Sequence, residues 1–176
     1  FSGMIDLENK TLRAVGKAEE RFKEDALRMM RGIRFSAQLN FSLEEDCFMG
    51  MRKLKENLGK VSKERIAVEL WKLLASEHPE KVEMLFSTGL SPYITRDFPK
   101  IGEAGIPILI PEAPKEKILR FGLFLRNVPI YAVKILRELK LDRMTIDGAS
   151  RFAKLFSENE VENPYALRKR IASDGM

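Results

Sequence analysis

The chain has 176 residues, 44% of them hydrophobic and 32% charged, and its formal net charge at pH 7 is +5. This composition predicts a soluble protein of one or two compact units with an anionic partner, and it excludes a membrane-spanning helix because no apolar run approaches ~20 residues. The one cysteine, Cys47, excludes an internal disulfide and a cysteine metal site, and it fits a reducing, cytoplasmic location.

Residues 1–16 are predicted to be extended, with a turn at Glu8-Asn9-Lys10. Gly16 ends this segment and frees the backbone to enter a helix. Because the chain starts at Phe1 and a motif begins within a few residues of it, we expect the chain to be the later part of a longer protein.

The stretch from Glu20 to Gln38 is predicted to form one amphipathic helix. Its apolar residues recur at steps of three or four and form one stripe, which consists of Phe22, Ala26, Met29, Ile33 and Ala37, widened by Leu27 and Met30. Arg28 lies four residues after Glu24 and three after Asp25, so both carboxylates can lie beside one guanidinium.

Arg31 and Arg34 continue the polar side of this helix, one and two turns after Arg28. The spacing is typical of a salt-bridged surface helix, in which each exposed pair contributes only ~0.3–0.5 kcal/mol. It also fits a binding surface. Arginine forms forked hydrogen bonds with phosphates and planar groups, and there is no lysine on this side.

Two further helices are predicted by their capping residues. Ser42 and Glu45 form the S-x-x-E pattern of a capping box, which predicts a helix from there to about Leu58, ended by Gly59. Ser62 is predicted to cap the next helix, whose buried face consists of leucine and isoleucine residues.

A shorter helix is predicted from His78-Pro79 to about Gly89, and His78 is interpreted as structural rather than as a metal ligand. Residues 98–114 contain four prolines and are predicted to be a connection, with Ile106 to Ile110 packed on the body. The remaining predicted helices cover residues 118–125, 131–139, 144–156 and 164–171. The basic cluster Arg168-Lys169-Arg170 is either a solvated end or a contact for backbone phosphate.

Three motifs occur in one order along the chain. They are Asp6-Leu7 with Leu12-Arg13-Ala14-Val15-Gly16, then Arg21 to Phe35 followed by Ala37-Gln38-Leu39, then Val61 to Ile66 with Glu69-Leu70. In this order and at this spacing they resemble the motifs of class II tRNA nucleotidyltransferases, the CCA-adding enzymes, and bacterial poly(A) polymerases share much of the pattern. The firm resemblance covers residues 4 to about 75.

The resemblance implies a mainly α fold, a multi-helix neck and body that follows a short extended or β segment. Residues 1–16 would be the remnant of an α/β nucleotidyltransferase head, residues 17–77 the nucleotide-selecting neck, and residues 78–176 the helical body. The resemblance also implies that the catalytic carboxylates and the Mg²⁺ ions belong to the head, so we expect no catalytic and no metal-binding residue in this chain. The chain alone is therefore expected to be inactive.

The resemblance implies that Glu24, Asp25, Arg28, Arg31 and Arg34 bind the nucleotide. A carboxylate only accepts hydrogen bonds and a guanidinium only donates them. Asp25 with Arg28 would therefore match C and A, which present an amino donor beside a ring acceptor, and would reject U and G. Glu24 would orient Arg28, and the two later arginines would meet the triphosphate. Glu64, Arg65 and Glu69 would brace this helix.

The implied function is addition of CCA to tRNA 3′ ends from CTP and ATP. Two alternatives remain open at this stage: a poly(A) polymerase or a relative that adds only CC or only A, and a non-catalytic helical RNA-binding module. The partners expected are tRNA, ATP and CTP, without a membrane.

Overall fold

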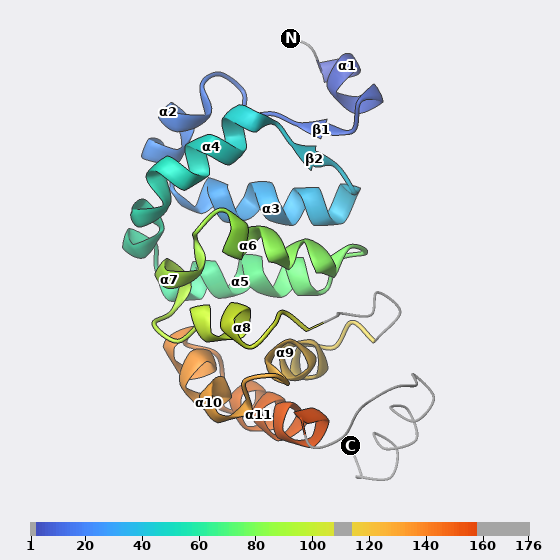
Figure 1. The fold of residues 1–176 in the computed structure, drawn as a ribbon, viewed down its shortest axis with the longest axis vertical. Coiled ribbons are helices and arrows are strands. Elements are labelled where there is room, and N and C mark those ends of the chain that lie inside the picture. The colour runs from blue at the N-terminus through green and yellow to red at the C-terminus, as the bar shows by residue number, and fades with distance from the viewer. Residues whose placement is uncertain (1–2, 108–113, 158–176) are drawn as a thin grey trace.

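The computed structural model describes residues 3–107 and 114–157. Figure 1 shows stacked layers of helices, with α1 (Gly3–Glu8) at one end and α10 (Pro129–Glu138) and α11 (Arg143–Ser157) at the other. The described residues contain one sheet, of two short parallel strands. The prediction of a mainly α fold with a small β element near the N-terminus is therefore confirmed.

The prediction that residues 1–16 are extended is wrong for its first half. Residues Gly3–Glu8 form α1, in which hydrogen bonds are made locally, such as that from the Asn9 amide to the Ile5 carbonyl. Because these bonds form within the segment, its backbone groups are satisfied without a neighbouring strand, which an extended segment would need. The predicted turn is present, and Lys10 ends it with a positive φ of 49°. Strand β1 (Thr11–Leu12) then pairs in parallel with β2 (Ser42–Leu43).

The predicted single helix over residues 20–38 is two helices, α2 (Ala18–Glu24) and α3 (Leu27–Leu39). The chain leaves the helical conformation at Asp25, which has φ −147° and ψ 105°. The apolar stripe is nevertheless confirmed, because its residues from Phe22 to Ala37 are all buried. Asn40 ends α3 in the left-handed conformation, with φ 54°.

The predicted capping box at Ser42 does not form. Helix α4 (Glu45–Leu54) begins three residues later, because Ser42 and Leu43 are extended and pair with β1. The Ser42 hydroxyl hydrogen-bonds to the Lys10 carbonyl instead of capping a helix. The chain then tightens into the 3₁₀ helix η1 (Lys55–Lys60), which runs past the predicted end at Gly59. Helix α5 (Lys63–Leu74) starts directly after Ser62 as predicted, although the serine side chain makes no capping bond.

The region after α5 is built from short helices. They are η2 (Pro79–Glu83), α6 (Met84–Ser87), α7 (Ser91–Ile94) and α8 (Pro99–Glu103), followed by α9 (Lys117–Leu125). Helix α8 corrects the prediction that residues 98–114 lack regular structure, since Pro99 occupies its first turn and supplies a preset φ. Residues 108–113, the predicted helix over 164–171 and the cluster Arg168-Lys169-Arg170 lie outside the described residues.

The core passes through every layer between α2 and α11. In the first layers, Met29, Met30 and Ile33 of α3 and Leu70 and Leu73 of α5 are fully buried. In the last layers α9 and α11 lie so close together that a Cβ added to Gly122 would be 2.4 Å from the Phe152 Cβ. Within residues 3–107 and 114–157, no helix combines the length and apolar character needed to cross a bilayer.

Candidate functional site

Asp25 lies at the joint between α2 and α3, where its side chain starts the second helix. The Leu27 amide donates to Asp25 Oδ1 at 3.0 Å, which satisfies one of the free amides at the N-terminus of α3. A short carboxylate competes well with the backbone for such a bond, which explains why the helix breaks at this residue.

The second oxygen of Asp25 faces α5. Arg65 donates to Asp25 Oδ2 at 2.9 Å, across 40 residues of sequence. Partial desolvation raises the pKa of Asp25, but the Leu27 amide and the Arg65 guanidinium outweigh it, so the pKa lies below its usual value. Because each carboxylate oxygen accepts about two hydrogen bonds, both oxygens keep room for another donor. Asp25 is therefore an ionised acceptor with spare capacity.

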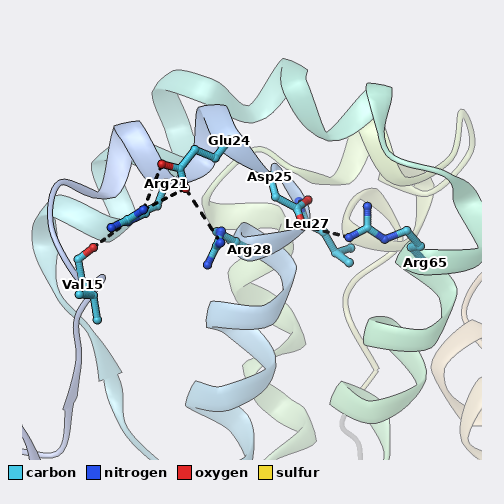
Figure 2. A network of polar contacts seen from close by, with 7 residues as sticks. All are labelled: Val15, Arg21, Glu24, Asp25, Leu27, Arg28 and Arg65. Atoms are coloured by element: carbon cyan, nitrogen blue, oxygen red, sulfur yellow. Dashed lines mark hydrogen bonds and ion pairs between the residues drawn. The ribbon is translucent and has the colours of Figure 1, made fainter.

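Arg28 lies beside Asp25 on α3, half exposed, and its contact is with Glu24. Figure 2 shows the Glu24 carboxylate between Arg21 and Arg28, while Asp25 turns toward Arg65. The Arg28 guanidinium is 4.0 Å from Glu24 Oε2, and Arg21 donates to both Glu24 oxygens at 3.0 and 3.1 Å. The structure thus brings the predicted trio Glu24, Asp25 and Arg28 to one joint, without a direct bond between Asp25 and Arg28 among the described residues.

A pocket of about 240 Å³ opens next to Arg28, between β1, α2, α3 and α4. Arg28 and Arg31 line it together, so these two predicted site residues share one surface. Its walls combine further arginines with apolar side chains, and the lining includes Arg13, Arg21, Phe22, Phe35, Leu43 and Met51. Such a surface suits a ligand that has a flat apolar part and a negative charge.

Arg34 lies away from this pocket. Six residues turn an α-helix by about 240° relative to Arg28, so Arg34 points at α5. It is 8% exposed, and its Nε donates to Glu69 at 2.6 Å while its guanidinium reaches Gln38. The guanidinium also lies 3.8 Å above the Phe35 ring. In this structure Arg34 therefore joins α3 to α5.

The comparisons with known proteins agree with one another. The family model described as "Probable RNA and SrmB- binding site of polymerase A" matches residues 40–101. The CCA-adding enzyme of Streptococcus thermophilus is 48% identical over 104 residues, which are 58% of this chain and 26% of that enzyme. The CCA-adding enzyme of Streptococcus pyogenes is 57% identical over 81 residues, or 46% of this chain and 20% of the enzyme.

A solved structure is similar to most of the chain. The crystal structure of the Bacillus stearothermophilus CCA-adding enzyme in complex with CTP superposes with a TM-score of 0.78 at 28% identity, over 94% of this chain and 42% of that one. The chain matches the RNA-binding neck and body region of the CCA-adding enzyme and poly(A) polymerase family. It spans about a quarter or less of the curated relatives it matches. A structure titled tRNA-processing enzyme complex 3, at 16% identity and a TM-score of 0.63, shares the fold.

Two arginines at the candidate site were missed by sequence reasoning in the roles that the structure gives them. Arg21 precedes Glu24 by three residues, a spacing that could have identified the pair. Arg65 was expected to brace the helix in general terms, but its bond to Asp25 joins residues 40 positions apart, which no local spacing reveals.

Side chains that could bind a metal form no cluster in the described part of the chain. Among residues 3–107 and 114–157, no three His, Cys, Asp or Glu side chains come close enough to hold a metal ion. His78 lies 3.2 Å from Glu80, at the start of η2.

Proposed function

We propose that this chain is the nucleotide-selecting neck and the RNA-binding body of an enzyme that adds CCA to tRNA 3′ ends from CTP and ATP. Its domain division would follow residues 1–16, 17–77 and 78–176. The names of the relatives support the reaction, and the description of the matched family model supports the RNA partner.

The observation that carries the proposal is that an ionised acceptor, Asp25, and a donor, Arg28, lie next to each other at one helix joint. Asp25 is fixed by Leu27 and Arg65 and keeps free acceptor positions, and Arg28 is held beside it by Glu24. An amino group of C or A would donate to Asp25, while a ring acceptor of the same base would receive from Arg28. U and G would leave both side chains mismatched, which is costly when water is excluded.

The other predicted residues divide between two tasks in this proposal. Arg31 lines the pocket beside Arg28 and would contact the phosphates of the nucleotide. Arg34 would have to break its bond to Glu69 before it contacted a nucleotide. Its contribution would therefore come mainly from holding α3 against α5.

No three His, Cys, Asp or Glu side chains of the described residues come close enough to hold a metal ion, so this proposal assigns no Mg²⁺ ligand to them. Nucleotidyl transfer that depends on Mg²⁺ would thus require ligands outside them, and the residues described here would select and hold the base and the RNA.

Poly(A) polymerase is the second candidate, favoured by the description of the matched family model. Relatives that add only CC or only A have the same requirement for base selection. A non-catalytic RNA-binding module is the candidate from another class.

One experiment separates these candidates. The complete natural protein is incubated with Mg²⁺, with each nucleoside triphosphate, and with tRNA that lacks its 3′ end. We expect two C and one A to be added and the reaction to stop. Continued addition of A would identify a poly(A) polymerase, and tRNA binding without incorporation would identify the module. The present 176-residue chain serves as the control, and it should bind without incorporating.

A further inference from the structure

Arg21 connects the segment that enters α2 with the carboxylate that holds Arg28. We propose that Arg21 is a positioning residue for base selection, which acts through Glu24 on Arg28. This inference rests on the proposed function, because it concerns how the same site keeps its geometry.

The contacts of Arg21 point in two directions. Its Nε donates to the Val15 carbonyl at 2.9 Å, and its terminal nitrogen donates to both Glu24 oxygens at 3.0 and 3.1 Å. Glu24 in turn lies 4.0 Å from Arg28 (Figure 2). A displacement of residues 13–16 would therefore move Glu24, which is the partner of Arg28, the side chain proposed to donate to the base.

The first part of the entry segment is anchored by Arg13, which pairs with Asp6 at 3.2 Å and with Glu44 at 3.1 Å, and by Ala14, which packs against the core, but these contacts end before Val15. Its strand β1 pairs over only two residues, and the Val15 side chain is 67% exposed, so packing does not fix the Val15 carbonyl. Gly16 follows with a positive φ of 83°, which lets the chain turn into α2 beside Arg21. The bond from Arg21 thus fastens the chain just before this turn.

The geometry requires arginine rather than any cation. A guanidinium donates from Nε and from a terminal nitrogen in fixed directions, whereas a lysine has one ammonium at the end of a flexible stem. Lysine at position 21 would preserve the charge near Glu24 but could not hold Glu24 and Val15 in the same arrangement. The side chains of Arg21, Glu24 and Arg28 are substantially exposed, so the loss should affect selection more than folding.

The test compares Arg21→Ala and Arg21→Lys in the complete protein. For both variants we expect kcat/KM for CTP and ATP to fall about three- to tenfold, with increased use of UTP and GTP and a nearly unchanged melting curve. Lys53→Ala is the matched control, because it removes another exposed ion pair of α2, between Lys53 and Glu19 at 2.8 Å. Full activity of Arg21→Lys would overturn the two-directional role.

A double variant tests the route through Glu24. In a Glu24→Ala background, Arg21→Ala should produce no further loss of selection. Equal and additive losses would overturn the proposal, since Arg21 would then act elsewhere. If Arg21→Ala does not fold, Arg21→Lys in both backgrounds gives the same comparison. Arg28→Ala separates the two proposals: an effect at Arg28 without one at Arg21 contradicts only this inference, and no effect at Arg28 contradicts the proposed function.

Discussion

Arg28 contributes little to the stability of the fold. Its side chain is 48% exposed, and its nearest carboxylate is 4.0 Å away in Glu24. Exposed pairs of this kind contribute ~0–1 kcal/mol. An effect of its removal on chemistry would therefore reveal contact with a substrate rather than loss of structure.

We predict that Arg28→Ala in the complete protein keeps its melting temperature but loses nucleotide incorporation. The loss should correspond to about 1.5–3 kcal/mol in transition-state terms, because C and A lose their donor partner. Discrimination against U and G should weaken for the same reason. Kinetics with all four nucleoside triphosphates, alongside a melting curve, provide the measurement. A variant that retains both rate and preference would make this helix a structural element alone.

The proximity of Glu24, Asp25 and Arg28 could be predicted from sequence, and so could the pair between Glu24 and Arg28, whereas the partners far along the chain could not. Glu24, Asp25 and Arg28 were identified by spacing and resemblance, and they do meet at one joint. Asp25 and Arg34 pair with Arg65 and Glu69, which lie 40 and 35 residues away. Such contacts depend on how α5 packs against α3, and local periodicity contains no information about that packing.

At the scale of elements, the buried pair between Arg34 and Glu69 joins α3 to α5. Both side chains are 10% exposed, and their atoms lie 2.6 Å apart. Removing one partner of a buried pair leaves the other charge without compensation, at a cost of about 3 kcal/mol or more.

We therefore predict that Glu69→Ala lowers the free energy of unfolding of this chain by about 3 kcal/mol. The control is Glu64→Ala on the same helix, whose exposed pair with Lys140 at 2.9 Å should contribute far less because solvent screens it. Denaturant titration measures both. Equal losses in the free energy of unfolding would show that the buried pair of Glu69 contributes no more than the exposed pair of Glu64.

Helix α11 begins at Arg143, directly after Asp142, which caps it. The Thr145 amide and hydroxyl donate to the two Asp142 oxygens at 2.8 and 2.7 Å. The Thr145 hydroxyl and then its amide lower the pKa of Asp142 to about 2. Since this is below the ordinary value of about 3.9, the stabilisation is fully present above about pH 4 and is lost as the pH falls through about 2.

Asp142→Ala should accordingly reduce stability by about 1 kcal/mol at pH 7, the usual value of such a cap, and by less as the pH falls from about 4 toward 2. Asp147→Ala, which removes an exposed pair with Arg143 at 3.6 Å inside the same helix, is the control. Unfolding curves at pH 7 and at about pH 2.5 measure the difference. A pH-independent cost would mean that the carboxylate charge is not involved.

The existence of the long helices followed from periodicity, but their joints did not. Asp25 looks helical by spacing, yet its carboxylate caps α3 and breaks the helix. Ser42 begins a capping box by pattern, yet it pairs with β1, because a strand of two residues carries almost no local signal. These failures share a cause: a short polar side chain has several competing partners, and tertiary contacts choose among them.

For the whole molecule, we predict that tRNA binding depends strongly on salt and weakly on sequence. The net charge of +5 favours contact with the phosphate backbone, and affinity should fall linearly with the logarithm of salt concentration. Replacing Arg168, Lys169 and Arg170 with alanine should reduce the slope by about one for each phosphate that these side chains neutralise. Titrations at several salt concentrations measure the slope. An unchanged slope would place the RNA on another surface, and salt-independent binding would contradict an electrostatic interface.

The pairing of β1 with β2 has a consequence for the order in which the molecule folds. Thr11 pairs with Ser42 and Leu12 with Leu43, so residues 13–41 form a loop that closes only when distant segments meet. Local helices form before such closures, because loop entropy must first be overcome. The amides of Ser42 and Glu44, which bond to Lys10 and Leu12, should exchange hydrogen faster than that of buried Ile33. Native-state exchange measures this order, and equal protection would contradict it. Faster exchange at Ser42 and Glu44 would mean that the pairing of β1 with β2 forms last and opens first. Residues 13–16, beside the candidate site, can then loosen while α3 and α5 stay folded.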